Sequence, residues 1–385
     1  MDWMITPGED GTLSEVLPSA LAAVGAAGFT GSLGIPSCRA AAVLLVDGLG
    51  WNLLHEHAAD APYLASLAGG EPIKAGFPTT TATSITSLGS GARPGVHGIV
   101  GYTFAEPSGG LLHALSWGTH GSVRDAQGHR RSLLEQWPPE QVQPEPTALE
   151  RAADAGIRVR SVAPAEFRGT GLTRAALRGG EFRGAHALGD LGAEVLDALA
   201  EPGPGLCYAY HGHLDAIGHV RGPGTPAWRL QLAQIDRLVE SLVARLPADT
   251  ALVVVADHGM VAVDPESVLD FDTTPALAEG VRLLGGDPRA RHVYAEPGAR
   301  DDVLATWREL LGDRGAAVLG EQAVDEGWFG KVTDAVRPRI GDVLAVMRES
   351  VVARSVGEPG ESSLRGHHGS LTADEQYVPL LIAQG

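Results

Sequence analysis

Five short clusters of threonine, aspartate and histidine carry the residues of this chain that could do chemistry. In the first, Phe77–Gly98 (FPTTTATSITSLGSGARPGVHG), three threonines follow a proline and precede a small-residue segment that predicts a helix. The other clusters lie at the ends of apolar runs: Asp47-Gly48, Asp215 to His219, Asp257-His258 and His367-His368. Together they supply a hydroxyl nucleophile and enough carboxylates and imidazoles to bind two metal ions.

The elements around these clusters predict an α/β fold with a mainly parallel central sheet flanked by helices. Short apolar runs at 41–46, 206–210 and 251–256 read as buried strands, and longer helical patterns lie between them. Asp47, Asp215 and Asp257 fall at or just past the ends of these strands. Because ligands bind beyond the carboxyl ends of parallel strands, we expect the three carboxylates to converge.

The helices and the domain division follow from the same patterns. We expect one helix over 50–68, interrupted just before Pro62, and another over 225–246. The segment 108–146 is less regular. A strand–helix–strand pattern within 279–349 predicts a small α+β cap, with segments at 292–296, 301–311, 316–320 and 342–347. The catalytic core would then comprise residues 1–278 and 350–385.

Three convergent carboxylates would repel one another in a dry cleft unless cations neutralise them. The added histidines favour zinc or another transition metal over magnesium, since imidazole suits borderline ions. Taken singly, Asp47-Gly48 also fits a plain turn, and Asp215 with His219, one helical turn apart, also fits a surface pair. We expect His211 and His213 to be neighbours of the site rather than ligands.

Composition narrows the classes of partner. The 385 residues include 29 Lys and Arg against 47 Asp and Glu, a net charge of −18, which argues against binding to nucleic-acid polymers or anionic membranes. Cys38 and Cys207 allow one disulfide but no four-cysteine zinc site. We see no signal peptide and no apolar stretch of the ~20 residues that a membrane span needs, so we expect a cytoplasmic protein.

In this order the clusters resemble the alkaline phosphatase superfamily, most closely its nucleotide pyrophosphatase/phosphodiesterase branch. The resemblance runs from Val43 to Ile382. The family's Asp-Gly after the first strand is matched by Asp47-Gly48. Its Pro-Thr-x-Thr segment with later Gly, Pro and His-Gly is matched by Pro78–Thr81 with Gly91, Pro94 and His97-Gly98. Its Asp-x-x-x-His is matched by Asp215 to His219, its Asp-His-Gly-Met by Asp257–Met260, and its last histidine before glycine by His368.

The resemblance implies an alkaline-phosphatase-like fold and a role for each matched residue. Thr81 would be the nucleophile. One zinc ion would be held by Asp47, Thr81, Asp257 and His258, and a second by Asp215, His219 and His368. Tyr102 stands where the branch has an asparagine that holds a phosphate oxygen, and a phenol can donate only one hydrogen bond.

The resemblance also implies an activity. We expect a zinc-dependent phosphodiesterase or nucleotide pyrophosphatase that forms a covalent phospho-threonine and acts on a small phosphate ester or nucleotide. A phosphomonoesterase or phosphonate hydrolase with the same centre is the main alternative. A non-catalytic metal-binding protein would explain the missing asparagine, and a transferase resembling the cofactor-independent phosphoglycerate mutases fits the three threonines poorly, because that branch uses serine.

Overall fold

A six-stranded sheet forms the centre of the protein, described by a computed structural model for residues 2–121 and 130–385. Its strands are parallel except for the last, which runs antiparallel along one edge. In spatial order they are β19 (Leu380–Gln384), β9 (Thr250–Val255), β1 (Ala40–Val46), β8 (Gly205–His211), β6 (Arg158–Pro164) and β7 (Glu181–Ala185). The predicted α/β class and the three predicted strands are thereby confirmed.

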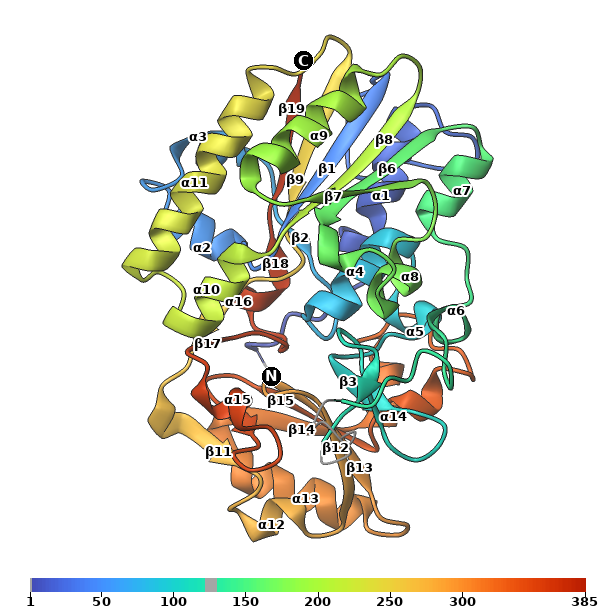
Figure 1. Ribbon diagram of the computed structural model, residues 1–385. Helices are drawn as coiled ribbons and strands as arrows, with labels where there is room; N and C mark the ends of the chain where they lie inside the picture. The colour runs from blue at the N-terminus through green and yellow to red at the C-terminus, as the bar shows by residue number, and fades with distance from the viewer. Residues whose placement is uncertain (1, 122–129) are drawn as a thin grey trace.

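The central strands form because their sequences are apolar on both faces. Every residue of β1 (AAAVLLV) and β9 (TALVVV) is buried, as expected for strands covered by helices on both sides. In Figure 1, α9 crosses the front of the sheet and α1 lies behind it. The larger covering helices are α1 (Val16–Ala23), α7 (Ala148–Asp154), α9 (Leu188–Ala200) and α11 (Pro226–Val243).

Two predicted helices differ from their expected bounds. The helix expected over 225–246 is α11, which ends at Val243. The helix expected over 50–68 is two short helices, α2 (Trp51–Glu56) and α3 (Pro62–Leu67), so the interruption before Pro62 is wider than predicted. Proline at the first position of α3 starts that helix anew, because its fixed φ suits a helix N-terminus.

A second, four-stranded sheet lies at the other end of the molecule with α13 packed on it (Figure 1). Its antiparallel strands, in order, are β12 (Val281–Asp287), β13 (Ala290–Ala295), β15 (Val343–Met347) and β14 (Gly315–Leu319), and α13 is Arg300–Leu311. The four predicted segments match β13, α13, β14 and β15, whereas β12 was not predicted. The assignment of 279–349 as a separate cap stays a prediction.

The hairpin of β12 and β13 is tied to the core by buried ion pairs. Arg289 bonds both carboxylate oxygens of Glu375, at 2.7 and 2.9 Å, and both side chains are fully buried. Arg291 pairs with Glu361 at 2.5 Å. Breaking one partner of such a buried pair costs about 3–5 kcal/mol, so the hairpin is firmly seated on the C-terminal segment.

Small sheets and short helices complete the fold. The segment 108–146 contains two short strands and one helical turn, while its residues 122–129 lie outside the described part of the chain. The remaining strands are β2 (Ile73–Lys74), β3 (Thr103–Ala105), β4 (Leu111–His113), β5 (Gly118–Thr119), β10 (Val261–Ala262), β11 (Val268–Asp270), β16 (Val351–Ala353), β17 (Gly366–His367) and β18 (Tyr377–Val378). The remaining α-helices are α4 (Thr81–Ser90), α5 (Pro94–His97), α6 (Pro139–Val142), α8 (Gly171–Ala176), α10 (His213–Arg221), α12 (Pro275–Ala278), α14 (Gly320–Asp325), α15 (Pro359–Ser363) and α16 (Ala373–Gln376).

Candidate metal centre and active site

The first group of candidate ligands is built by the register of two neighbouring strands. Leu45 of β1 pairs with Val255 of β9, so Asp47 and Asp257 follow at the same level of the sheet edge. The Nε2 atom of His258 lies 3.4 Å from Asp47 Oδ1 and 3.5 Å from Asp257 Oδ2. We call Asp47, Asp257 and His258 the inner cluster, because all three are buried.

Thr81 adds its hydroxyl to the inner cluster. It is the first residue of α4, and its Oγ1 lies 3.2 Å from His258 Nε2. Burial raises the pKa of Asp47, and the nearby Thr81 hydroxyl opposes a small part of that rise. The first turn of a helix favours negative charge, so a hydroxyl oxygen at this position is well placed to react as an alkoxide.

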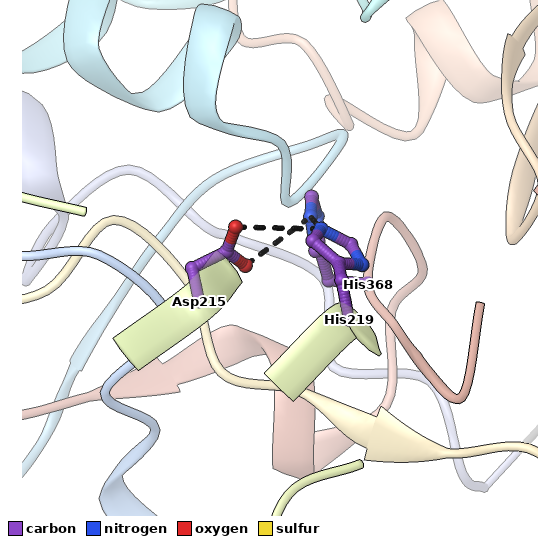
Figure 2. Close-up of side chains that lie close together, drawn as sticks. All are labelled: Asp215, His219 and His368. Carbon is purple, nitrogen blue, oxygen red and sulfur yellow. Dashed lines mark hydrogen bonds and ion pairs between the residues drawn. The ribbon is translucent and has the colours of Figure 1, made fainter. Parts of the chain in front are cut away.

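The second group of candidate ligands comes from α10 and the C-terminal segment. Asp215 and His219 lie one turn apart on α10, with Asp215 Oδ2 at 3.4 Å from His219 Nε2. His368, which follows β17, places its Nε2 3.8 Å from Asp215 Oδ1. Figure 2 shows the Asp215 carboxylate facing both imidazole rings. We call Asp215, His219 and His368 the outer cluster.

Gly48 lets the two clusters approach each other. It has a φ of +77°, a conformation that residues with a Cβ rarely adopt. A Cβ at this position would lie 3.0 Å from both Cα and Cβ of Asp215. The rings of His258 and His368, one from each cluster, stack with their centroids 3.6 Å apart. The structure therefore brings all seven predicted ligand residues, Thr81 included, to one centre.

Backbone carbonyls orient the three histidines. His258 Nδ1 lies 2.9 Å from Gly259 O, His219 Nδ1 lies 2.8 Å from Gly366 O, and His368 Nδ1 lies 2.8 Å from Thr79 O. A carbonyl only accepts, so each Nδ1 carries the proton and each neutral ring presents a lone pair at Nε2. The Nε2 atoms of His219 and His368 are 3.2 Å apart. Two lone pairs facing each other at that distance call for a cation between them.

The carboxylates give the same indication. Burial, and then the neighbouring charge of Asp257, raise the pKa of Asp47 well above its usual value. Burial with the charge of Asp47 raises the pKa of Asp215 to about 8, and burial with the charge of Asp215 raises the pKa of Asp257 to about 7. One oxygen of each carboxylate, Asp47 Oδ1, Asp215 Oδ1 and Asp257 Oδ2, is buried without a hydrogen-bond partner in the described part of the chain. This donor set of unpartnered carboxylate oxygens and imidazole nitrogens fits divalent metal ions.

Tyr102 lies beside a different set of side chains. Its hydroxyl is 2.6 Å from His113 Nε2, and burial raises the pKa of the phenol to about 12, so the phenol stays protonated. Burial raises the pKa of Asp287 to about 7, and the backbone N–H of Tyr102, which faces this carboxyl group, opposes part of that rise. Asp287 also accepts a bond from Thr80, the neighbour of Thr81, so Tyr102 is linked to the three threonines at 79–81 through this carboxyl group.

Sequence reasoning missed two residues of the site. Tyr210 donates a 2.5 Å hydrogen bond to Asp47 Oδ2, the carboxylate oxygen that faces away from His258. Its signal was its place near the end of β8, the strand paired with β1. Asp287 had no such signal, because the strand that carries it was not predicted. His211 and His213 lie next to each other, with ring centroids 5.1 Å apart, and neither belongs to a candidate ligand group among the described residues.

A family comparison decides the class. The model of the family "Type I phosphodiesterase / nucleotide pyrophosphatase" matches residues 41–371. This chain belongs to that family. The family is metal-dependent, and membership identifies the chain as a phosphoester hydrolase. In the part of the chain that the structure describes, no helix combines the length and apolar character needed to cross a bilayer.

Solved structures share the fold. Murine ectonucleotide pyrophosphatase/phosphodiesterase 5 aligns with a TM-score of 0.68 and 16% identity, covering 90% of this chain and 88% of that one. Phosphonoacetate hydrolase from Sinorhizobium meliloti 1021, in complex with phosphonoacetate, aligns with a TM-score of 0.65 and 20% identity, covering 91% of each chain. At these identities the likeness shows the fold alone.

A curated relative matches a short segment. The catalytic subunit of GPI ethanolamine phosphate transferase 3 from Homo sapiens is 47% identical over 47 residues, 12% of this chain, and its Mus musculus counterpart is 45% identical over the same length. The match spans only 4% of the length of each relative. It is a local likeness to another protein of phosphate chemistry.

Proposed function

We propose that this protein is a two-zinc phosphodiesterase or nucleotide pyrophosphatase with Thr81 as its nucleophile. The observation that carries the proposal is the position of Thr81 Oγ1, at the N-terminus of α4 and 3.2 Å from His258 Nε2 in a buried cluster of ligand type. The inner cluster with Thr81 would hold one ion, and the outer cluster would hold the other.

Each group of the chain has a part in the reaction. Bound zinc would act as a Lewis acid, lowering the pKa of Thr81 and of the attacking water and offsetting charge on the leaving oxygen. Thr81 Oγ1 would attack phosphorus, forming a phospho-threonine as the bond to the leaving oxygen breaks. Water would then attack the same phosphorus, and the bond to Oγ1 would break, returning the hydroxyl. The bonds from the histidine rings to backbone carbonyls, and the close approach at Gly48, would keep the ligand side chains fixed in place. Catalysis requires such fixed orientation of the reacting groups.

The proposed substrate is a small phosphate ester or nucleotide. A structural neighbour of this chain, an inactive threonine-to-alanine variant of murine ectonucleotide pyrophosphatase/phosphodiesterase 5, is in complex with AMP. Tyr102 would contact the substrate on the side away from the metal ions, with its one O–H. A phosphonate hydrolase is the second candidate, favoured by the phosphonoacetate complex of another neighbour.

The test compares Thr81→Ala with Thr81→Ser in metal-loaded protein. We expect the alanine variant to retain its metal content and to lose at least ~1,000-fold in kcat, because a nucleophile has no substitute. Serine keeps a hydroxyl and should retain most of the activity. Assays with bis-p-nitrophenyl phosphate, p-nitrophenyl phosphate, a nucleotide p-nitrophenyl ester and phosphonoacetate would separate the substrate classes. Full activity of Thr81→Ala would remove Thr81 from this role.

A further inference from the structure

The three consecutive threonines of the nucleophile segment bond to three different parts of the protein. Thr79 donates to Ser370 O at 3.0 Å and accepts from Gly369 N at 2.9 Å, which ties it to the segment carrying His368. Thr81 faces the inner cluster. Thr80 donates to Asp287 Oδ1 at 3.0 Å, and both of these side chains are buried. The hydroxyl of Thr80 therefore points at the β12–β13 hairpin.

The position of Thr80 is one from which a threonine can cap its own helix. Thr80 is the N-cap of α4, with extended φ and ψ of −135° and 141°. A threonine there ordinarily accepts a hydrogen bond from an N–H group of the first helical turn. The Thr80 side chain makes no such bond. The bond to Asp287 holds the hydroxyl in a different direction.

As a result, the first turn of α4 keeps its N–H groups free. The first N–H to find an intrahelical partner is that of Ser84, which bonds Thr80 O at 2.9 Å. Within residues 2–121 and 130–385, no acceptor takes a bond from the N–H groups of Thr81, Ala82 or Thr83. Helix N-termini with free N–H groups bind phosphate oxygens, and this one begins at the proposed nucleophile.

Asp287 is fixed in place from both sides. It ends β12 and pairs with Ala290 across the hairpin, and its Cβ lies 3.1 Å from where a Cβ would stand at Gly369. The backbone N–H of Tyr102 faces the same carboxyl group. The hairpin fixes the backbone of Asp287, so its Oδ1 can hold the Thr80 side chain in one rotamer, while its Oδ2 has no hydrogen-bond partner among the described residues.

We propose that Asp287 is a positioning residue that keeps the N-terminus of α4 open for the phosphoryl group of the substrate. It does so by holding the Thr80 hydroxyl away from the first-turn N–H groups that this hydroxyl would otherwise cap. The inference rests on the proposed function, because it takes the substrate to be a phosphate ester bound at Thr81.

The test measures binding of inorganic phosphate to the metal-loaded protein by calorimetry, with metal content and thermal unfolding recorded for every variant. In Asp287→Ala the Thr80 hydroxyl is free to cap its own helix, and since such a cap contributes ~1 kcal/mol, we expect the phosphate Kd to rise about fivefold. Asp287→Asn keeps an oxygen that accepts from Thr80 and should bind phosphate as the unaltered protein does.

The decisive variant is the double substitution Asp287→Ala with Thr80→Val. Valine has no hydroxyl and cannot cap the helix, so we expect phosphate affinity to return toward the original value. If Asp287 had only a structural role, the double variant should bind phosphate more weakly than either single variant. That result would overturn the proposal. An unchanged phosphate Kd in Asp287→Ala would overturn it as well.

Two further outcomes keep the test informative. If Asp287→Ala does not fold, Thr80→Val alone serves, because it should leave phosphate binding intact, and a severalfold loss in it contradicts the proposal. If the unaltered protein binds metal but neither binds phosphate nor hydrolyses any ester, the proposed function itself fails and this inference falls with it. Normal hydrolysis by all the Asp287 variants with unchanged phosphate binding removes the positioning role alone.

Discussion

The inner and outer clusters use similar residue types in different surroundings. The side chains of Asp257 and His258 are 0% exposed and that of Asp47 is 3% exposed, whereas those of His368, Asp215 and His219 are 8%, 14% and 24% exposed. The inner carboxylates follow two adjacent central strands, and the outer ligands come from one helix and the C-terminal segment. A rigid, buried cluster suits an ion that activates the nucleophile, and a more open one suits the entry of water and the exit of the leaving group.

The largest expected effect concerns the inner cluster. Asp257→Asn removes the charge of a fully buried carboxylate whose Oδ1 also accepts from Gly48 N. Since changing a residue behind a metal ligand already costs about 10–100-fold, we expect a loss of more than ~100-fold in both metal affinity and kcat. Asp215→Asn is the matched variant in the outer cluster and should lose less metal affinity. Metal titration measures both affinities. Equal losses of metal affinity in the two variants would show that the clusters do not differ in how they hold metal.

Metal should be removed more easily from the outer cluster than from the inner cluster. We expect a chelator to remove the ion at the outer cluster first, because His219 and Asp215 are partly exposed to solvent. If the chain holds two ions as proposed, His219→Ala should reduce the metal content to one per chain while leaving the fold intact. Metal analysis during stepwise dialysis checks this, and simultaneous loss of both ions would show that the clusters act as one unit.

A smaller loss of metal affinity or activity is expected for Tyr210, which supports the inner-cluster residue Asp47. Tyr210→Phe removes the hydrogen bond to Asp47 Oδ2, and such supporting bonds contribute about 10–100-fold to metal affinity or activity. Tyr208→Phe is the control on the same strand, because the buried Tyr208 hydroxyl has no hydrogen-bond partner within residues 2–121 and 130–385. We expect the control to keep full activity. If the two variants behaved alike, Tyr210 would have no part in holding Asp47.

The smallest effect is a dependence of stability on pH in the metal-free protein. With the pKa of Asp215 raised to about 8 and that of Asp257 to about 7, the folded chain holds protons that the unfolded chain has already released. Above about pH 7.5, where unfolded histidines are mostly neutral, the free energy of unfolding should therefore fall as pH rises through 8. The metal-loaded protein should show a smaller fall, because bound metal keeps Asp215 and Asp257 ionised while burial still raises the pKa of Asp287 to about 7. Thermal unfolding with and without metal checks this, and a rise with pH would contradict it.

The sequence predicted the inner cluster for a physical reason. Asp47 and Asp257 each follow a continuous apolar run, and a buried parallel strand is the simplest structure for such a run. His368 could be chosen over His367 only through the family resemblance, because both stand in one dipeptide. The structure separates them: His367 pairs with Val261 in a small sheet, while His368 faces Asp215.

Contacts between residues far apart in the chain could not be predicted from the sequence. The three threonines at 79–81 are chemically alike, and only their partners, which lie far along the chain, distinguish them. The strand β12 was missed because Gly285 and Gly286 interrupt its apolar pattern. Gly286 has a φ of +80°, and a Cβ there would meet Ala290 O at 2.1 Å, so glycine serves the tight hairpin that carries Asp287.

The buried pair of Arg289 and Glu375 has a consequence for how substrates come and go. Arg289 also donates to the carbonyls of Met347, Arg348 and Ser350, so its guanidinium reaches five acceptors, and the two oxygens of Glu375 belong to α16, outside the smaller sheet. If the smaller sheet swung outward as a hinged lid, the ion pair would break and leave the Arg289 guanidinium and the Glu375 carboxylate without each other. Turnover should therefore proceed with the two sheets held together by this buried ion pair rather than by opening between them.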